Sequence, residues 1–249
     1  MNKIKVSAVS YLNSKPFIYG LQQSSLINEL DLQLDIPSVC AQKLLDGAVD
    51  IGLIPVAVIP GLKETHIISN YCIGAVGKVA SVMLYSEVPL KEIKSVLLDY
   101  QSRTSVTLVR ILAKNYWKIS PEWQSAQANY EDTISGTTAA VIIGDRTFGL
   151  EGRYKYAYDL SEEWQKFTGL PFVFACWVAN KKLSADFISA FDQALKIGLD
   201  SRPELIAEIS KSGKYLTDIG KYLNESLSYD FDNSKKQGLE LFLNYLKEL

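Results

Sequence analysis

Segments typical of strands and of helices alternate through the first half of the chain, and this order constrains the fold more than any other feature. The apolar runs are KIKVSAV, LQLDI, DIGLIPV, SVMLYS and SVLLDY. Between several of them lie amphipathic stretches, which are PFIYGLQQ, AQKLLDGA and TSVTLVRILAKNYW. Such alternation is typical of α/β folds in which helices connect parallel strands. We therefore predict an α/β protein.

The second half of the chain returns to strands and then becomes helical. The apolar runs AAVIIGD and FVFACWVAN predict two further strands, and from Ser184 onward the pattern is helical, with Ser184 and Asp232 as expected N-caps. No Gly/Ser-rich linker occurs, so two lobes must be joined by the strands themselves. We expect a crossover near Leu90 and a return near Phe174. Residues 1–90 and 175–249 would then form lobe I and residues 91–174 lobe II, with a ligand cleft between them.

Charge and hydropathy narrow the class of partner. The net charge is −2 without a basic cluster, which argues against nucleic acid. No apolar run approaches the roughly 18 residues that a membrane span needs. The N-terminal segment lacks a signal-peptide pattern and already alternates like a strand. We expect a cytoplasmic protein that binds a small molecule.

Metal and cofactor chemistry have little support in the sequence. The three cysteines show no CxxC spacing, and His66 is the only histidine, so neither a disulfide framework nor a metal site is predicted. Motifs for nucleotide cofactors and for serine or zinc hydrolases are also missing from the sequence. We therefore expect no metal and no cofactor.

The stretch SYLNSKPF, from Ser10 to Phe17, places polar residues directly after the first predicted strand. In open α/β sheets, ligands bind beyond the carboxyl ends of strands. The alternative is capping, in which Asn13 or Ser14 caps the next helix and Pro16 lies in its first turn. Local chemistry alone favours the cap.

Three other segments carry candidate residues. In LDYQSRTS a strand ends, and Arg103, Thr104 and Ser105 lead into a helix whose N-terminus favours an anion. The alternative there is an N-cap with a solvated arginine. In IIGDRTF a buried strand ends at Gly144 and Asp145, where Asp145 either accepts a substrate hydroxyl or caps a turn. In GKVASVMLYS, Ser81 begins a strand, a position that is usually structural.

Taken together, the segments resemble one family, the chorismate dehydratases of the futalosine route to menaquinone. The resemblance runs in the same order from about Ile4 to Trp177. It rests on SYLNSKPF, LLDGAVDIGLIPV, VASVMLYS, DYQSRTSVTLVRIL, AAVIIGD and TGLPFVFACW. It implies a periplasmic-binding-protein-like type II fold with two α/β lobes around chorismate. It also implies a cofactor-free lyase that eliminates water to give 3-[(1-carboxyvinyl)oxy]benzoate.

The resemblance also implies residue roles. Asn13 and Ser81 would face the substrate and are the catalytic candidates. The substrate-binding candidates around them are Ser10, Arg103, Thr104, Ser105, Gly144 and Asp145. No side chain stands out as the base, so we hypothesise that the enolpyruvyl carboxylate of the substrate takes the C3 proton.

Alternative functions remain on the same fold, because fold does not give function. The sister family, 1,4-dihydroxy-6-naphthoate synthase, is expected to place a catalytic histidine where this chain has Gly144 and Asp145, which weakens that assignment. A non-catalytic small-anion binding protein would usually carry a secretion signal or an N-terminal anchor cysteine, whereas the first cysteine is Cys40. The sensor lobe of a transcription regulator is less favoured, because no DNA-binding segment is attached.

Overall fold

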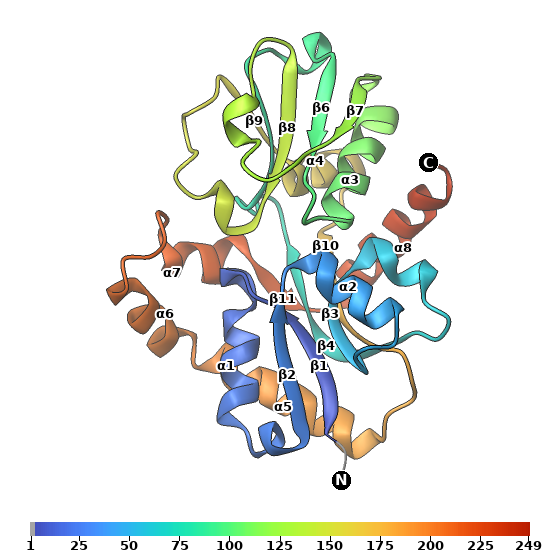
Figure 1. Cartoon of the computed structure of the whole chain (residues 1–249), viewed down its shortest axis with the longest axis vertical. Helices are drawn as coiled ribbons and strands as arrows, with labels where there is room; N and C mark the ends of the chain where they lie inside the picture. The colour runs from blue at the N-terminus through green and yellow to red at the C-terminus, as the bar shows by residue number, and fades with distance from the viewer. Residues whose placement is uncertain (1–2) are drawn as a thin grey trace.

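Two mixed β-sheets, flanked by helices, make up the protein (Figure 1). The computed structural model describes residues 3–249, so the first two residues of the expected lobe I lie outside the described range. In order across the first sheet, the strands are β11 (Ser228–Asp230), β4 (His66–Ala75), β10 (Phe172–Ala179), β3 (Ile51–Pro55), β1 (Ile4–Val9) and β2 (Leu30–Asp35). The second sheet contains β7 (Glu122–Ser125), β6 (Ser95–Leu98), β8 (Thr138–Ile143), β5 (Val82–Ser86) and β9 (Tyr156–Asp159).

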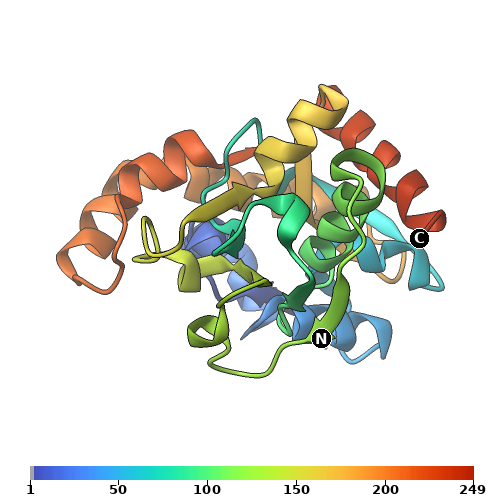
Figure 2. The ribbon, with the colours of Figure 1, turned by 90° about the horizontal axis from the view of Figure 1, so that it is seen from above.

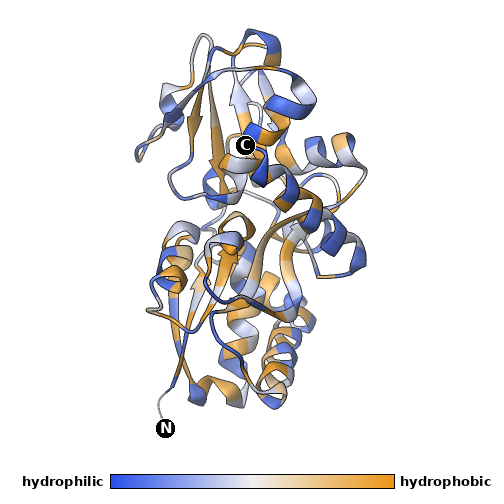
Figure 3. Ribbon diagram, turned by 90° about the vertical axis from the view of Figure 1, so that its right-hand side faces the viewer, coloured by the Kyte–Doolittle hydropathy of each residue, from blue (hydrophilic) through white to orange (hydrophobic). Residues whose placement is uncertain are grey.

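Strand pairing confirms the predicted α/β class. Strand β1 is parallel to β2 and β3, and β6 is parallel to β7 and β8. The other pairings are antiparallel, including those of β10 and β5. Strands β3 and β10 are buried along their whole length, which explains their unbroken apolar sequences. Figure 3 shows hydrophobic residues along the strands of both sheets.

Helices connect and cover these strands. They are α1 (Lys15–Gln23), α2 (Pro37–Leu45), α3 (Thr104–Leu112), α4 (Leu160–Thr168), α5 (Ala185–Asp200), α6 (Arg202–Lys211), α7 (Ile219–Lys221) and α8 (Asn233–Lys247). Seen from above, the α6–α7 segment and α8 lie on opposite sides of the molecule (Figure 2). Both expected N-caps are confirmed: the Ser184 hydroxyl accepts the Phe187 N–H, and the Asp232 carboxylate accepts the Lys235 N–H.

The chain passes between the sheets twice, at positions that differ from the expected boundaries. Residues 76–81 connect β4 to β5, and residues 169–171 connect α4 to β10. Strand β5, expected in lobe I, pairs with β8 and β9 in the second sheet. Residues 172–174, expected in lobe II, begin β10 in the first sheet. An apolar run predicts a strand, but it does not indicate which sheet that strand joins.

Helices α1 and α5 cross with their backbones in contact. A Cβ at Gly198 would lie 1.7 Å from the Pro16 carbonyl oxygen, and one at Gly20 would lie 2.1 Å from the Ala194 carbonyl oxygen. Only glycine allows such a close backbone approach. The crossing fixes the first turn of α1, which begins two residues after Asn13.

We expect Gly198→Ala to lower the free energy of unfolding by about 1–3 kcal/mol, because the added methyl group must push α1 away from α5. Urea unfolding measures this change. The matched control is Gly220→Ala, also in a helix, where the new Cβ meets its nearest atom at an ordinary 3.4 Å. Equal stability losses in the two variants would contradict the close crossing.

Candidate active site

A cavity of about 530 Å³, measured to its open mouth, lies between the two sheets. The polar residues that line it are Tyr11, Asn13, Ser14, Ser81, Ser102, Thr104 and Ser105. They follow β1 and β6 and precede β5, so both sheets contribute. The lining contains no charged side chain among the described residues.

Asn13 lies in a short 3₁₀ helix, Leu12–Ser14, between β1 and α1. Its side-chain oxygen accepts the Ser14 hydroxyl at 2.9 Å, and its main-chain carbonyl accepts the Tyr229 hydroxyl at 3.0 Å. Neither Asn13 nor Ser14 makes a side-chain capping bond, so the capping interpretation is wrong for both. Pro16 does lie in the first turn of α1, as predicted. The Asn13 side chain therefore lines the cavity and does not cap the helix.

Ser81 ends the first connection between the sheets and is 1 % exposed. Its main-chain carbonyl accepts the Gly144 N–H at 2.8 Å, which ties it to the end of β8. Its side-chain oxygen is 2.8 Å from the hydroxyl of Tyr222, a residue of the C-terminal helical segment. Ser81 thus reaches the cavity from a firmly held backbone.

Three hydroxyls line the cavity at the start of α3, one from Ser102 just before the helix and two from its first residues, Thr104 and Ser105. The Ser102 hydroxyl accepts the Ser105 N–H at 3.0 Å and so caps the start of the helix. The Thr104 hydroxyl donates to the Phe174 carbonyl at 3.1 Å and accepts the Ala57 N–H at 3.2 Å, which links α3 to the first sheet. Thr104 and Ser105 line the cavity as part of this helix start.

Two of the predicted binding residues point elsewhere. Arg103 is exposed and is not among the cavity residues, which agrees with the solvated-arginine alternative. Ser10 is also exposed, and its N–H donates to the Asp35 carbonyl at 2.9 Å in the first sheet. Neither side chain lines the cavity.

Asp145 and Gly144 lie where the chain leaves β8, and they act on the loop that carries Asn13. The Asp145 carboxylate accepts the Leu12 N–H at 3.0 and 3.2 Å and is not among the cavity residues. Burial raises the pKa of Asp145 above its ordinary value, although the Leu12 hydrogen bond opposes the change. Gly144 has φ +65°, and a Cβ there would lie 2.5 Å from the Tyr11 ring. Glycine therefore lets Tyr11 pack against the end of β8.

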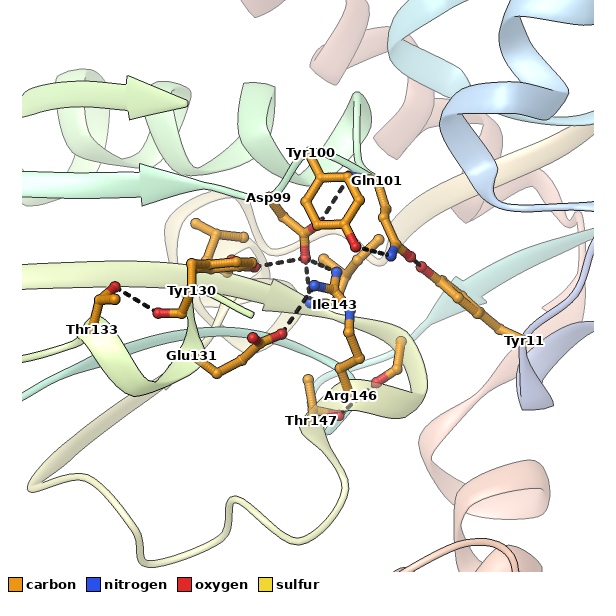
Figure 4. Close-up of polar contacts among 12 residues, drawn as sticks. Tyr11, Asp99, Tyr100, Gln101, Tyr130, Glu131, Thr133, Ile143, Arg146 and Thr147 are labelled. Atoms are coloured by element: carbon orange, nitrogen blue, oxygen red, sulfur yellow. Dashed lines mark hydrogen bonds and ion pairs between the residues drawn. The ribbon is translucent and has the colours of Figure 1, made fainter. Parts of the chain in front are cut away.

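A buried network beside the cavity was not predicted from the sequence (Figure 4). The Asp99 carboxylate, whose side chain has no exposed surface, accepts the Tyr130 hydroxyl at 2.9 Å and the Ile143 N–H at 3.0 Å. It also pairs with Arg146. Burial disfavours the charge of Arg146, but the hydrogen bond that Arg146 donates to Asp99 raises the pKa of Arg146 above its ordinary value. Arg146 therefore stays charged within the network.

This network reaches the cavity through Tyr11. The Tyr11 hydroxyl donates to the Gln101 side-chain oxygen, and the Gln101 N–H donates to Asp99 at 2.9 Å. Burial raises the pKa of Tyr11, so its phenol stays protonated. Both segments, LDYQSRTS and IIGDRTF, are candidates in the sequence, but their contact with each other depends on the pairing of β6 with β8.

Neither a metal-binding cluster nor a membrane-spanning helix occurs within residues 3–249. No group of three or more His, Cys, Asp or Glu residues has a metal-binding arrangement in this range. None of its helices combines the length and the apolarity required to cross a bilayer. The three cysteines, Cys40, Cys72 and Cys176, are buried and reduced.

Solved structures with the same arrangement share the periplasmic-binding-protein-like fold. A protein from Archaeoglobus fulgidus has a TM-score of 0.73 at 12% identity, covering 99% of this chain and 97% of its own. A Candida albicans protein with the generic periplasmic binding protein fold has a TM-score of 0.63 at 14% identity, covering 100% and 91%. The aliphatic sulphonate binding protein of Escherichia coli has a TM-score of 0.60 at 14% identity, covering 98% and 87%. These similarities confirm the predicted fold.

Sequence comparison gives the family. A chorismate dehydratase of Thermus thermophilus is 24% identical over 262 residues, which cover 93% of this chain and 96% of that protein. The model of the menaquinone biosynthesis family VitK2_biosynth matches residues 4–248. Because that match spans nearly the whole chain, the protein belongs to this menaquinone biosynthesis family.

Proposed function

We propose that the protein is a chorismate dehydratase, a carbon–oxygen lyase that converts chorismate to 3-[(1-carboxyvinyl)oxy]benzoate and water. The observation that carries the proposal is the meeting of Asn13 and Ser81 in one cavity, in a chain of the menaquinone biosynthesis family. The named relative from Thermus thermophilus supports the same reaction.

The chemistry of this reaction suits a cavity of neutral hydrogen-bond donors. Dehydration removes the C3 proton and the C4 hydroxyl, and the ring becomes aromatic, so the substrate supplies the thermodynamic drive. The C3 proton is vinylogous to the ring carboxylate, and its removal spreads negative charge toward that group. Donors fixed in advance at this charge lower the barrier of an E1cB-like path. Asn13, Ser81 and the main-chain N–H groups at the start of α3 are such donors.

The proton acceptor in this proposal is the enolpyruvyl carboxylate of the substrate. None of the cavity-lining side chains within residues 3–249 is a carboxylate, an imidazole or an amine. The enolpyruvyl carboxylate is tethered to C3 itself, so fixing its rotamer brings a base next to the proton. Such proximity supplies several kcal/mol without a protein base.

Mixing the purified protein with chorismate tests the proposal. We expect the ultraviolet absorbance of an aromatic product to appear together with the loss of one water by mass spectrometry. Saturable binding with unchanged chorismate would instead support a small-anion binding protein, the second candidate, which the similarity to the sulphonate binding fold favours. If chorismate is neither bound nor converted, both candidate functions are wrong.

The position of His66 argues against the naphthoate synthase alternative. His66 begins β4, bonds Glu64 at 2.7 Å and has a side chain that is 39% exposed. The cavity residue of the same strand is Ile73, seven positions along, or roughly 23 Å away at the rise of an extended strand. The single histidine therefore lies too far away to act on a bound ligand.

The variant Asp145→Asn tests whether Asp145 or the enolpyruvyl carboxylate of the substrate is the base. Since Asp145 bonds the Leu12 N–H and an amide oxygen can accept the same bond, we expect kcat/KM to stay within about tenfold of the wild type. Steady-state kinetics with chorismate measure this ratio. Abolished turnover in a variant with unchanged Tm would make Asp145 the base and would exclude the substrate carboxylate. Asp145→Ala, which removes the acceptor, is the comparison and should raise KM more.

A further inference from the structure

Tyr222 lies against the cavity wall, although it comes from the C-terminal helical segment. It begins a π-helical turn, Tyr222–Ser226, directly after α7, and it is 2% exposed. The Phe148 ring packs edge-on against it, with ring centroids 5.1 Å apart. Its hydroxyl is 2.8 Å from the Ser81 side-chain oxygen. Tyr222 is thus a rigid, buried neighbour of a cavity hydroxyl.

The Tyr222 hydroxyl is the donor in this hydrogen bond. Burial raises the pKa of Tyr222 well above its ordinary value, so the phenol keeps its proton. Tyr222 is not among the cavity-lining residues, and a buried donor without an acceptor is unfavourable. The Tyr222 hydroxyl therefore donates its hydrogen bond to the Ser81 side-chain oxygen.

This arrangement leaves the Ser81 proton for the cavity. Ser81 lines the cavity, and within residues 3–249 its hydroxyl hydrogen has no protein acceptor besides the Tyr222 oxygen, which is already the donor. The nearby Asn13 side chain lowers the pKa of Tyr222, but the effect of burial is larger. Each donor in such a chain polarises the next one. Tyr222 therefore turns Ser81 into a donor aimed at a bound ligand.

We propose that Tyr222 is a positioning residue for the dehydration, which fixes the Ser81 hydroxyl as a donor to a substrate oxygen that gains negative charge in the transition state. This inference rests on the proposed function. It assigns no proton transfer to Tyr222 itself, because the phenol remains neutral throughout. It gives the C-terminal helical segment a role in the site.

Tyr222→Phe tests the inference while retaining the ring and its packing on Phe148. We expect kcat for chorismate to fall about tenfold, with KM changed less than about threefold, because the lost bond acts on the transition state. Tyr85→Phe is the matched control, since Tyr85 is also a buried tyrosine but does not line the cavity. Thermal unfolding of each variant reports the fold.

A double-mutant cycle distinguishes positioning from a general structural effect. If Tyr222 acts through Ser81, Tyr222→Phe should change kcat less than about twofold in the Ser81→Ala background. Unchanged kcat in Tyr222→Phe, or additive losses in the double variant, would overturn the role of Tyr222. The proposed function would still hold in that case, provided that the wild-type protein converts chorismate. A wild-type protein that does not convert chorismate would overturn both.

Discussion

Replacing Asn13 with aspartate is expected to lower kcat/KM for chorismate about 1,000-fold. Chorismate carries two carboxylates, and a further negative charge about 4 Å from one of them costs about 4 kcal/mol at the effective dielectric of a partly exposed site. Each 1.36 kcal/mol corresponds to a tenfold change in rate. The Asn13 oxygen accepts the Ser14 hydroxyl, which a carboxylate oxygen also accepts, so Tm should change little. Steady-state kinetics with chorismate measure the loss of turnover, and calorimetric titration measures the loss of binding.

The control for this variant is Asn244→Asp, which introduces the same charge on the exposed face of α8. It should leave kcat/KM within about twofold, because exposed charges beyond a Debye length of about 8 Å are screened. Full activity of Asn13→Asp would remove Asn13 from the site. Equal losses in both variants would point to net charge and not to a local contact.

Much of the fold could be predicted because it depends on local patterns. The alternation of apolar and amphipathic segments gives the α/β class, and Ser184 and Asp232 precede helices in the manner of N-caps. The sheet that each strand joins depends on distant partners. Strand β5 was therefore predicted in lobe I, whereas it pairs with β8 and β9 in the second sheet.

The candidate site was predictable to the extent that its residues follow strand ends. Asn13, Ser81, Thr104, Ser105 and Gly144 were all selected from the sequence, and all line the same cavity. Thr104, Ser105 and Gly144 follow β6 and β8, where ligand sites of α/β sheets are expected, whereas Asn13 and Ser81 were selected through the family resemblance.

The remaining site residues depend on geometry that a local pattern does not contain. Ser10 and Arg103 have the right chemistry but side chains that face solvent. Asp145 reaches the backbone of Leu12, 133 positions earlier, instead of the cavity. Tyr222 contacts Ser81 across 141 positions of sequence and lies in a segment whose pattern is simply helical.

The buried ion pair of Asp99 and Arg146 joins the loops that follow β6 and β8 in the second sheet. Asp99 receives hydrogen bonds from Tyr130, from the Gln101 N–H and from the Ile143 N–H, and Arg146 also bonds Glu131 at 3.0 Å. The Arg146 guanidinium lies 5.3 Å from the centre of the Tyr100 ring. Removing one member leaves the other charge buried without its partner, which costs far more than losing an exposed ion pair.

Arg146→Met should therefore lower the free energy of unfolding by about 3–5 kcal/mol, as measured by urea unfolding. Arg153→Met is the matched control, because Arg153 forms an exposed pair with Asp132, and its unfolding midpoint should hardly change. The double variant Arg146→Met/Asp99→Asn removes both charges together and should recover part of the loss, because no buried carboxylate then remains unpaired. If the double variant is less stable than Arg146→Met by the full cost of Asp99→Asn alone, the two residues are not coupled. The ion pair would then not be what stabilises this wall of the cavity.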